Sequence, residues 1–335
     1  MPMIDTSVLV DGFFSPTESN PVAGQAEDQV VEWLWRVGFL TSPRQEAHLR
    51  SFELGLYHGI VTPRADVAAM VLGLKWFCWG SLADDQYDNY EGKDGERRFA
   101  EVVSDMRAVI AGQGISPSNP VVAGFADYWP DLTRCLDEVG RRRITVDYLG
   151  YLEAVALQNR YHARGEVPDE ATFVPMRRRT VAMIFQVDVL EVVSAYRIPE
   201  TLRDGAVFRE LVRCFADVAA WHNDVYGVEK DVADGQTCNM VRVLAESTRC
   251  GLDEAAARVV ERARHRQHVF LTCERQLPGL ATELGLAPES AEQALGLARD
   301  LRAYLYANLI WCGRTRRYDL ELPRTRGTFD DVLSG

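Results

Sequence analysis

Apolar residues recur every three or four positions along most of this chain, which is the spacing of an amphipathic α-helix. One such segment begins with Thr62 and Pro63, an N-cap and first-turn pair, and is expected to end near Asp84. The sequence lacks the strict alternation and hairpin turns that are typical of strands. The pattern therefore predicts an all-α fold. Its further helical segments are 99–110, 144–161, 173–196, 208–228, 252–276 and 288–311.

No composition shift, low-complexity linker or internal repeat divides the 335 residues, so we predict one α-helical domain over residues 1–335. Turns rich in Gly, Pro and Ser, such as residues 112–120, separate the helical segments. The two ends have the most irregular sequence. Residues 1–24 and 319–335 are therefore the candidates for flexible segments.

Composition narrows the classes of partner. Hydrophobic residues make up 47% of the chain, which is enough for one large buried core. The net charge of -12 argues against nucleic-acid and anionic-membrane partners, because both present negative phosphates. An anionic substrate would need metal ions or a local basic cluster.

The seven cysteines are widely scattered and form no CxxC pair or zinc-type spacing, as expected for reduced thiols. The first residues lack a basic leader, and no later run approaches the roughly 18 apolar residues of a membrane span. We therefore expect a cytoplasmic protein.

Three aspartates, Asp84, Asp85 and Asp88, lie in residues 81–90, where an apolar helical segment gives way to polar sequence. If the helix persists, Asp84 and Asp88 share one face, and like charges at that spacing cost a few tenths of a kcal/mol (~0.3). Carboxylates suit Mg²⁺, which bridges one or two of them to substrate phosphates. The alternative is a solvated helix end.

A second polar cluster lies in residues 219–235, where Asn223, Gly227 and Asp231 stand at i, i+4 and i+8 on nearly one helical face. Asn223 and Asp231 offer oxygen ligands, and Lys230 can reach a phosphate held by such a metal. A charged, exposed helix is the alternative. It explains Gly227 poorly, because glycine costs about 1 kcal/mol inside a helix unless something approaches closely.

The two clusters read DDQYD and NDVYGVEKD, and they resemble the paired DDxxD and NDxxSxxKE-like Mg²⁺ motifs of bacterial class I terpene synthases. Two positions depart from the family pattern. Gly227 stands where the family usually has Ser or Thr, which removes a metal-ligating hydroxyl, and Asp231 stands where it usually has Glu. We expect a shifted ion rather than a lost one.

The resemblance extends to two basic elements. The family has a diphosphate-sensing arginine 46 residues before the motif's asparagine, and that position is Arg177, with Arg178 and Arg179 beside it. It also has an Arg-Tyr pair near the C-terminus, matched by Arg317 and Tyr318. Four ordered elements thus cover residues 84–318.

The resemblance implies a class I terpenoid synthase-like helical bundle around a central active-site cavity. It further implies a terpene cyclase that ionises a linear isoprenyl diphosphate and releases diphosphate. Three Mg²⁺ ions are expected, two on Asp84 with support from Asp88 and the third on Asn223, Gly227 and Asp231. The groups expected to neutralise the leaving diphosphate are Arg177, Lys230, Arg317 and Tyr318.

A carbocation requires an apolar pocket whose aromatic faces stabilise moving positive charge. Gly80 and Ser81 precede Asp84 where relatives often have large aromatics, and Val181 is medium-sized at the expected effector position, so the sequence indicates a roomy pocket. A roomy pocket favours C20 geranylgeranyl diphosphate as the substrate, whereas most bacterial relatives use C15 farnesyl diphosphate. Both substrates stay open. The aromatic candidates, each also explained by ordinary core packing, are Phe77, Trp79, Phe185 and Trp311.

Four alternatives to a cyclase remain. A chain-elongating prenyltransferase or a head-to-head condensing enzyme usually carries a second aspartate-rich motif in place of the asparagine motif. A metal-dependent phosphohydrolase would need paired His-Asp ligands, which the six histidines do not provide. A non-catalytic helical binding protein would leave the aspartates and arginines on solvated surfaces. The sequence leaves monomer and homodimer open.

Overall fold

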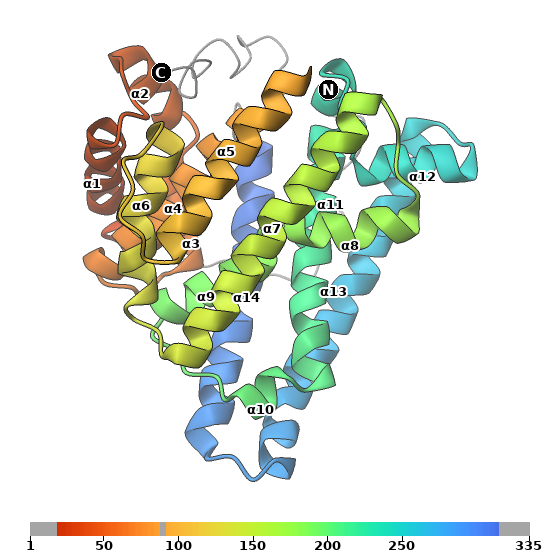
Figure 1. Cartoon of the computed structure of the whole chain (residues 1–335). Helices are drawn as coiled ribbons and strands as arrows, with labels where there is room; N and C mark the ends of the chain where they lie inside the picture. Colours follow the sequence, from red (N-terminus) through yellow and green to blue (C-terminus); the bar gives the residue numbers. More distant parts are fainter. Residues whose placement is uncertain (1–18, 88–91, 315–335) are drawn as a thin grey trace. The chain divides into compact units, whose positions relative to one another are not determined.

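The computed structural model describes residues 19–87 and 92–314, and this part of the chain contains fourteen α-helices and no strand (Figure 1). The all-α prediction is confirmed. Side chains are described throughout this part except at residues 84–87, 92–94 and 313–314. The expectation of flexible ends concerns segments that lie mostly outside the described residues, and it stays a prediction.

The described chain divides into two compact units, residues 19–152 and 153–313, with the boundary inside helix α7 (Glu138–Arg164). We call them the N-terminal unit and the C-terminal unit and describe each by itself. The prediction that they form one domain stays a prediction.

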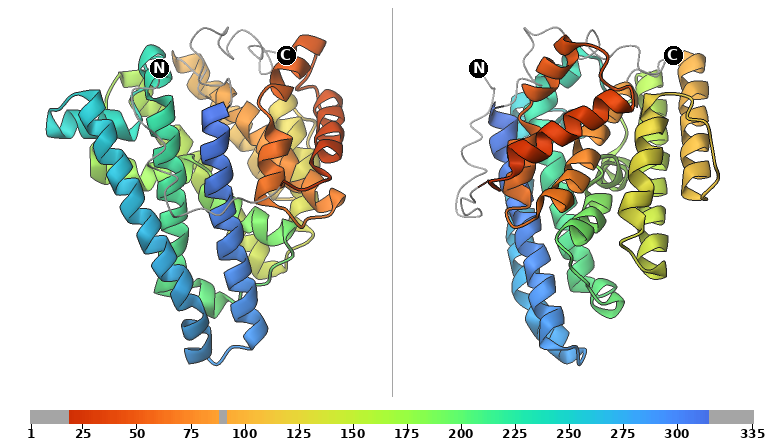
Figure 2. Two further views of the ribbon diagram at one scale, coloured as in Figure 1. Left: turned by 180° about the vertical axis from the view of Figure 1, so that it is seen from behind. Right: turned by 90° about the vertical axis from the view of Figure 1, so that its left-hand side faces the viewer.

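The N-terminal unit is built on α4, which packs against α1, α3 and α6, while α5 packs on α6 (Figures 1 and 2). Aromatic rings fill its interior. The ring centroids of Phe125 and Tyr148 lie 4.8 Å apart, and those of Trp76 and Trp79 lie 5.6 Å apart. The helices of this unit are α1 (Ala23–Arg36), α2 (Pro43–Arg50), α3 (Leu54–Val61), α4 (Val67–Tyr87), α5 (Gly92–Ile110), α6 (Pro120–Thr133) and the first part of α7.

Local capping explains where α4 begins and corrects the expected start at Thr62 and Pro63. The carboxylate of Asp66 accepts a hydrogen bond of 2.8 Å from the backbone N–H of Ala69, so Asp66 caps the helix. Thr62 instead ends α3, and its hydroxyl donates to the carbonyl of His58 over 2.9 Å. The Thr-Pro pair was a plausible start signal, but the aspartate four residues later provides the cap.

The C-terminal unit is built on two long helices, α11 and α13, which run side by side in both figures (Figures 1 and 2). Helix α8 packs on α11 and α12, and α9 packs on α11. The core here is mostly aliphatic, with members such as Val225, Met240, Val259 and Leu309. The helices of this unit are the rest of α7, α8 (Glu170–Thr180), α9 (Met183–Val193), α10 (Glu200–Arg203), α11 (Ala206–Ala233), α12 (Met240–Thr248), α13 (Leu252–Glu283) and α14 (Pro288–Arg314).

The single helix expected over residues 173–196 is wrong, because the chain breaks between α8 and α9. Val181 ends α8, and Ala182 adopts a left-handed backbone conformation with φ of 60°. Helical periodicity is the same on both sides of the break, so it carried no signal. The break lies four to five residues after Arg177.

Six helices had no sequence prediction: α1, α2, α3, α6, α10 and α12. Helix α3 shows the reason, because seven of its eight residues are buried and no polar face marks its period. The other expected helices are present, with ends that differ from the expected ones by up to seven residues.

None of the described helices is long and apolar enough to cross a lipid bilayer. All seven cysteines are free thiols, and five of them are buried. The reduced state predicted for them agrees with this structure. The cytoplasmic location stays a prediction.

Candidate functional site

Helix α11 carries the second polar cluster, as its periodicity predicted. Gly227 is buried inside this 28-residue helix, whereas Asn223 and Asp231 are partly exposed. Asp224, next to Asn223, is buried among apolar neighbours of the same helix. The cluster thus lies where α11 passes from the interior to the surface of its unit.

Arg177, at the end of α8, reaches this cluster. One terminal nitrogen of its guanidinium donates to the Oδ1 atom of Asn223 over 2.9 Å and to the Oδ1 atom of Asp224 over 2.7 Å. Its Nε atom also donates to Asp224, over 3.0 Å. The packing of α8 on α11 thus brings the predicted sensor arginine, 46 residues before Asn223, onto the predicted metal motif.

The same contact separates Arg177 from its two neighbours in sequence. Arg178 makes a bidentate ion pair with Asp217, with distances of 2.6 and 2.9 Å. Arg179 is exposed. Of the three consecutive arginines, Arg177 alone makes a recorded contact with the asparagine motif.

Asp224 is held from two sides. Its Oδ1 atom faces Arg177, and its Oδ2 atom accepts a hydrogen bond of 2.9 Å from the backbone N–H of Met240. Burial raises the pKa of the Asp224 carboxyl above its usual value, and Arg177 and the Met240 N–H oppose that shift. The ion pair with Arg177 compensates part of the cost of burying this carboxylate.

Asp231 is oriented by a residue from the next helix. The side-chain amide of Asn239 donates to the Oδ2 atom of Asp231 over 2.8 Å. Burial raises the pKa of the Asp231 carboxyl, and the hydrogen bond from Asn239 opposes the shift. A carboxylate in such surroundings gains from a nearby cation.

The donor types on α11 fit Mg²⁺. Asn223 offers an amide oxygen and Asp231 a carboxylate, both of the oxygen class that this ion prefers. Gly227 adds no side-chain ligand, and waters would complete such a site, since Mg²⁺ commonly keeps several. Within residues whose side chains are described, no group of three or more His, Cys, Asp or Glu comes together.

Lys230 lies one turn from the end of α11. Its ammonium nitrogen lies 3.4 Å from a carboxylate oxygen of Asp234. This pair is partly exposed, so it costs little to break. The expected role of Lys230 toward a phosphate stays a prediction.

The first aspartate motif is described only in part. Asp84 and Asp85 lie in the last turn of α4, which continues to Tyr87, but their side chains are outside the described set. Asp88, Arg317 and Tyr318 lie outside the described residues altogether. Their expected roles stay predictions.

The pocket candidates of the N-terminal unit lie on α4. Phe77 stacks on Tyr57 with ring centroids 4.5 Å apart, and Ser81 is partly buried. The indole N–H of Trp79 donates to the carbonyl of Val121 over 2.9 Å, which satisfies its polar atom inside the core. Beside Gly80, the ring of Trp76 lies 3.7 Å from the place a Cβ atom would take.

The pocket candidates of the C-terminal unit lie on three elements. Val181 is partly buried at the break that follows α8. Phe185 on α9 is 1% exposed, and Trp311 near the end of α14 is 7% exposed. Whether these side chains line a substrate pocket stays a prediction.

Sequence reasoning missed Asp224 and Asn239 as parts of this cluster. Asp224 stood inside the quoted motif, but a helical wheel places it off the face shared by Asn223 and Asp231. Asn239 follows a short turn and precedes an apolar segment, which is an N-cap signal. That signal predicts a helix start and says nothing of the contact with Asp231.

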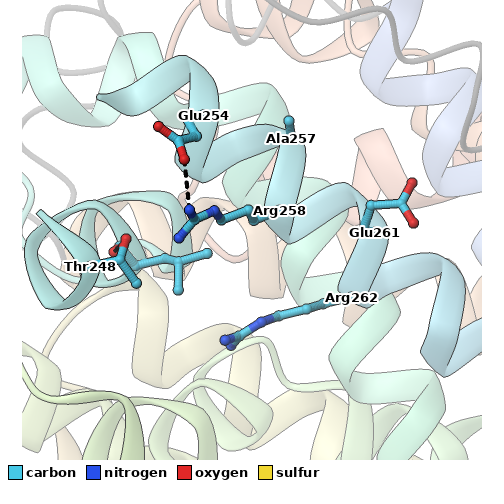
Figure 3. Close-up of a pocket in the computed structure, with 7 residues that line it drawn as sticks. Thr248, Glu254, Ala257, Arg258, Glu261 and Arg262 are labelled. Atoms are coloured by element: carbon cyan, nitrogen blue, oxygen red, sulfur yellow. Dashed lines mark hydrogen bonds and ion pairs between the residues drawn. The ribbon is translucent and has the colours of Figure 1, made fainter. Parts of the chain in front are cut away.

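An open surface hollow of about 390 Å³ lies between α12 and α13 (Figure 3). Arg258 points toward Glu254 in this hollow, at 2.6 Å, and Arg262 pairs with Glu170 at 2.5 Å. Both arginines are therefore neutralised by carboxylates. None of the site residues predicted from the sequence lines the hollow.

Known proteins similar to this chain form one group. A family model described as "Terpene synthase family 2, C-terminal metal binding" matches residues 75–268. A pristinol synthase of Streptomyces pristinaespiralis is 25% identical over 309 residues, covering 91% of this chain and 83% of that protein. An isoafricanol synthase of Streptomyces violaceusniger is 27% identical over 342 residues, covering 96% and 85%.

Solved structures show the same fold. A linalool/nerolidol synthase from Streptomyces clavuligerus superposes with a TM-score of 0.80 at 22% identity, covering 89% of this chain and 98% of that one. A germacradien-4-ol synthase from Streptomyces citricolor gives a TM-score of 0.78 at 23% identity, covering 90% and 97%. The fold predicted from the sequence is confirmed.

Proposed function

Since this chain belongs to the terpene synthase family whose model it matches over residues 75–268, we propose that it cyclises C15 farnesyl diphosphate with the help of Mg²⁺. It is a terpene cyclase, a lyase that acts on isoprenyl diphosphates. The substrate length, the number of ions and the residue roles are the proposed part.

The contact that carries the proposal is the one between Arg177 and Asn223, at 2.9 Å. A guanidinium beside an oxygen-rich motif can bind an anion that the motif's metal also binds. Diphosphate is such an anion. This contact therefore favours a diphosphate-binding enzyme over a non-catalytic helical protein.

The reaction begins with heterolysis of the bond between the allylic carbon and the diphosphate oxygen, and diphosphate leaves with the electron pair. A π bond of the same chain then attacks the cation and closes a ring. Loss of a proton or capture of water ends the reaction. The largest barrier is the separation of charge, so groups that stabilise the leaving diphosphate matter most.

Mg²⁺, when bound, supplies positive charge that stabilises the leaving diphosphate. We propose that Asp84, Asp85 and Asp88 hold Mg²⁺ and that Asn223 and Asp231 hold a further ion, with a water in the place that a side chain at Gly227 would take, three ions in all. Arg177 and Lys230 bind diphosphate oxygens by charge-assisted hydrogen bonds, together with Arg317 and Tyr318.

Aromatic and apolar side chains protect the cation from water. Phe77, Trp79, Phe185 and Trp311 are the proposed aromatic members, because their faces attract positive charge. Val181 and Ser81 add smaller surfaces. The preference for C15 over C20 is supported by the sesquiterpene synthases among the relatives. A Cβ atom at Gly80 would be in ordinary contact with the ring of Trp76, at 3.7 Å.

We also propose that the two compact units act as one catalytic domain. The family match runs from residue 75 to residue 268 and so crosses the boundary between residues 152 and 153. Both Mg²⁺ motifs fall within that match. This supports the single domain expected from the sequence.

The test is turnover of geranyl, farnesyl and geranylgeranyl diphosphates, each supplied separately with Mg²⁺, followed by gas chromatography and mass spectrometry. We expect a cyclic C15 product from farnesyl diphosphate that disappears with EDTA and in Asp84→Ala. Cyclic product from the C20 substrate alone would move the proposal to diterpenes. Longer linear diphosphates, formed when isopentenyl diphosphate is added as a second substrate, would identify a prenyltransferase instead.

Arg177→Lys tests the sensor role, with Arg179→Lys as the matched control two residues away. Lysine keeps the charge but loses the planar fork that reaches both Asn223 and Asp224. We expect kcat to fall at least tenfold in Arg177→Lys and to stay within twofold in Arg179→Lys. Equal kcat values in the two variants would remove Arg177 from the proposed machinery.

A further inference from the structure

Asn239 is a fully buried polar residue at the start of α12, directly after the turn that follows α11. Its side-chain Oδ1 atom accepts a hydrogen bond of 2.8 Å from the backbone N–H of Val241 and so caps the helix. Aspartate, serine or threonine could cap equally well. Capping therefore explains the Oδ1 atom of Asn239 but not its amide nitrogen.

The amide nitrogen of Asn239 makes two further hydrogen bonds, one with each of its protons. One goes to the backbone carbonyl of Asp224 over 2.8 Å, and the other goes to the Oδ2 atom of Asp231 over 2.8 Å. Two donors and one acceptor on a short side chain are available only from asparagine. Asn239 therefore joins two turns of α11 that lie seven residues apart in sequence.

The next residue extends the connection to the arginine. The backbone N–H of Met240 donates to the Oδ2 atom of Asp224, and the Oδ1 atom of the same carboxylate accepts from Arg177. A continuous series of hydrogen bonds of 2.7–2.9 Å thus runs from Arg177 through Asp224 and the start of α12 to Asp231.

We propose that Asn239 is a positioning residue for Mg²⁺ and diphosphate binding, which rests on the function proposed above. Its amide occupies one carboxylate oxygen of Asp231 and leaves the other for the ion. Hydrogen-bonded partners of this kind orient metal-binding carboxylates, and their loss costs about 10–100-fold in metal affinity. Asp231 is one methylene shorter than the glutamate usual in the family, so its direction matters more.

The same residue keeps Arg177 and Asp231 in register. Because Asn239 and Met240 are consecutive, a displacement of the start of α12 moves Asp231 and Asp224 together, and Arg177 follows Asp224. The diphosphate-binding arginine and the metal-binding carboxylate are thereby positioned by one turn of chain.

The test compares Asn239→Ser with Asn119→Ser. Serine keeps a capping oxygen at both positions. Asn119 caps α6 in the same way, accepting from the N–H of Val122 over 3.0 Å, but its recorded amide contact is the hydroxyl of Ser118. Only Asn239→Ser removes a donor from a carboxylate. The readout is the rise in Tm that Mg²⁺ and inorganic diphosphate produce together, titrated with Mg²⁺ and without turnover.

We expect the Mg²⁺ concentration for half of the Tm rise to increase at least tenfold in Asn239→Ser and to stay within twofold in Asn119→Ser. Turnover of farnesyl diphosphate by Asn239→Ser should recover at high Mg²⁺. An unchanged Mg²⁺ midpoint in Asn239→Ser would overturn the positioning role and leave Asn239 as a helix cap.

Asn239→Asp covers the case in which the serine variant does not fold. Aspartate keeps the size and the cap but presents an acceptor to Asp231, so we expect an equal or larger increase of the midpoint. A wild-type protein with no Mg²⁺-dependent rise in Tm would overturn the proposed function itself. A normal wild-type rise that both Asn239 variants share would overturn this inference alone.

Discussion

The two compact units bury different kinds of side chain. In the N-terminal unit, rings contact rings: Trp129 and Tyr148 have centroids 5.5 Å apart, and Trp76 and Tyr128 have centroids 6.3 Å apart. In the C-terminal unit, buried carboxylates face arginines. Asp217 and Asp224 are each 1% exposed and accept hydrogen bonds from Arg178 and Arg177.

This difference has an energetic meaning. Aromatic packing is favourable without a partner of opposite charge, so a ring-filled interior avoids the desolvation cost of buried charges. A buried ion pair roughly breaks even with apolar packing, and removing one partner is strongly destabilising. The buried charges of the C-terminal unit fix the orientation of their partners, and the guanidinium of Arg177 is oriented in this way by Asp224.

The largest expected effect comes from breaking the ion pairs around Asp217. This carboxylate accepts from Arg178 and lies 2.8 Å from the Nε atom of Arg266, so Asp217→Asn leaves two partly buried arginines short of a charge. We expect the free energy of unfolding to fall by about 3 kcal/mol. Urea denaturation followed by circular dichroism measures it.

Glu254→Gln is the control for that measurement. Glu254 pairs with Arg258 at 2.6 Å, but both side chains are about half exposed, and the expected loss is within about 0.5 kcal/mol. If Asp217→Asn lost no more than Glu254→Gln, the contrast between the two interiors would have no energetic basis.

Much of this fold could be predicted from the sequence, because the long amphipathic helices show apolar residues at every third or fourth position. Helix α11 and its three positions Asn223, Gly227 and Asp231 followed from spacing alone. The choice of Arg177 came from the family spacing of 46 residues, whereas its contact with Asn223 was found in the structure. The features that could be predicted were those that repeat along a single helix.

Contacts between elements were not readable in this way. The break at Ala182 depends on one left-handed residue, and alanine gives no local sign of it. The pairing of Asn239 with Asp231 depends on how the turn after α11 returns to that helix. Tertiary packing decides both, and periodicity holds no information about it.

Gly124→Ala tests how tightly the aromatic side chains of the N-terminal unit are packed. A Cβ atom at Gly124 would lie 2.5 Å from the Cδ1 atom of Trp79, whose indole N–H is also held by Val121. The ring cannot move without losing that hydrogen bond, so we expect a loss of about 2 kcal/mol. Differential scanning calorimetry measures the corresponding fall in Tm.

The matched glycine is Gly279, which lies inside α13 with no atom within 4 Å of the Cβ position. Gly279→Ala should stabilise the protein by about 0.5–1 kcal/mol, because alanine is the better helix former. A Gly124→Ala variant as stable as Gly279→Ala would mean that the rings around Trp79 yield easily. The aromatic interior of the N-terminal unit would then accommodate an added methyl group by small shifts of its rings.

The smallest effect concerns His58, a titratable ring inside the N-terminal unit. Burial lowers its pKa from 6.5 to about 4, so between these values the unfolded chain binds more protons than the folded one. Stability contributed by the neutral ring is complete above pH 6.5 and is lost as pH falls toward 4. At pH 5.5 the loss amounts to about 1.4 kcal/mol relative to pH 7.5.

His58→Leu should remove that loss, since leucine does not titrate, and exposed His265→Gln should leave it unchanged. Urea unfolding of the wild type and both variants at pH 7.5 and 5.5 gives the comparison. If the wild type and His58→Leu lost the same free energy on acidification, the ring would be hydrated in the folded state. The N-terminal unit would then admit water among its aromatic side chains, and the contrast with the charged interior of the C-terminal unit would be one of composition, without a difference in solvent exclusion.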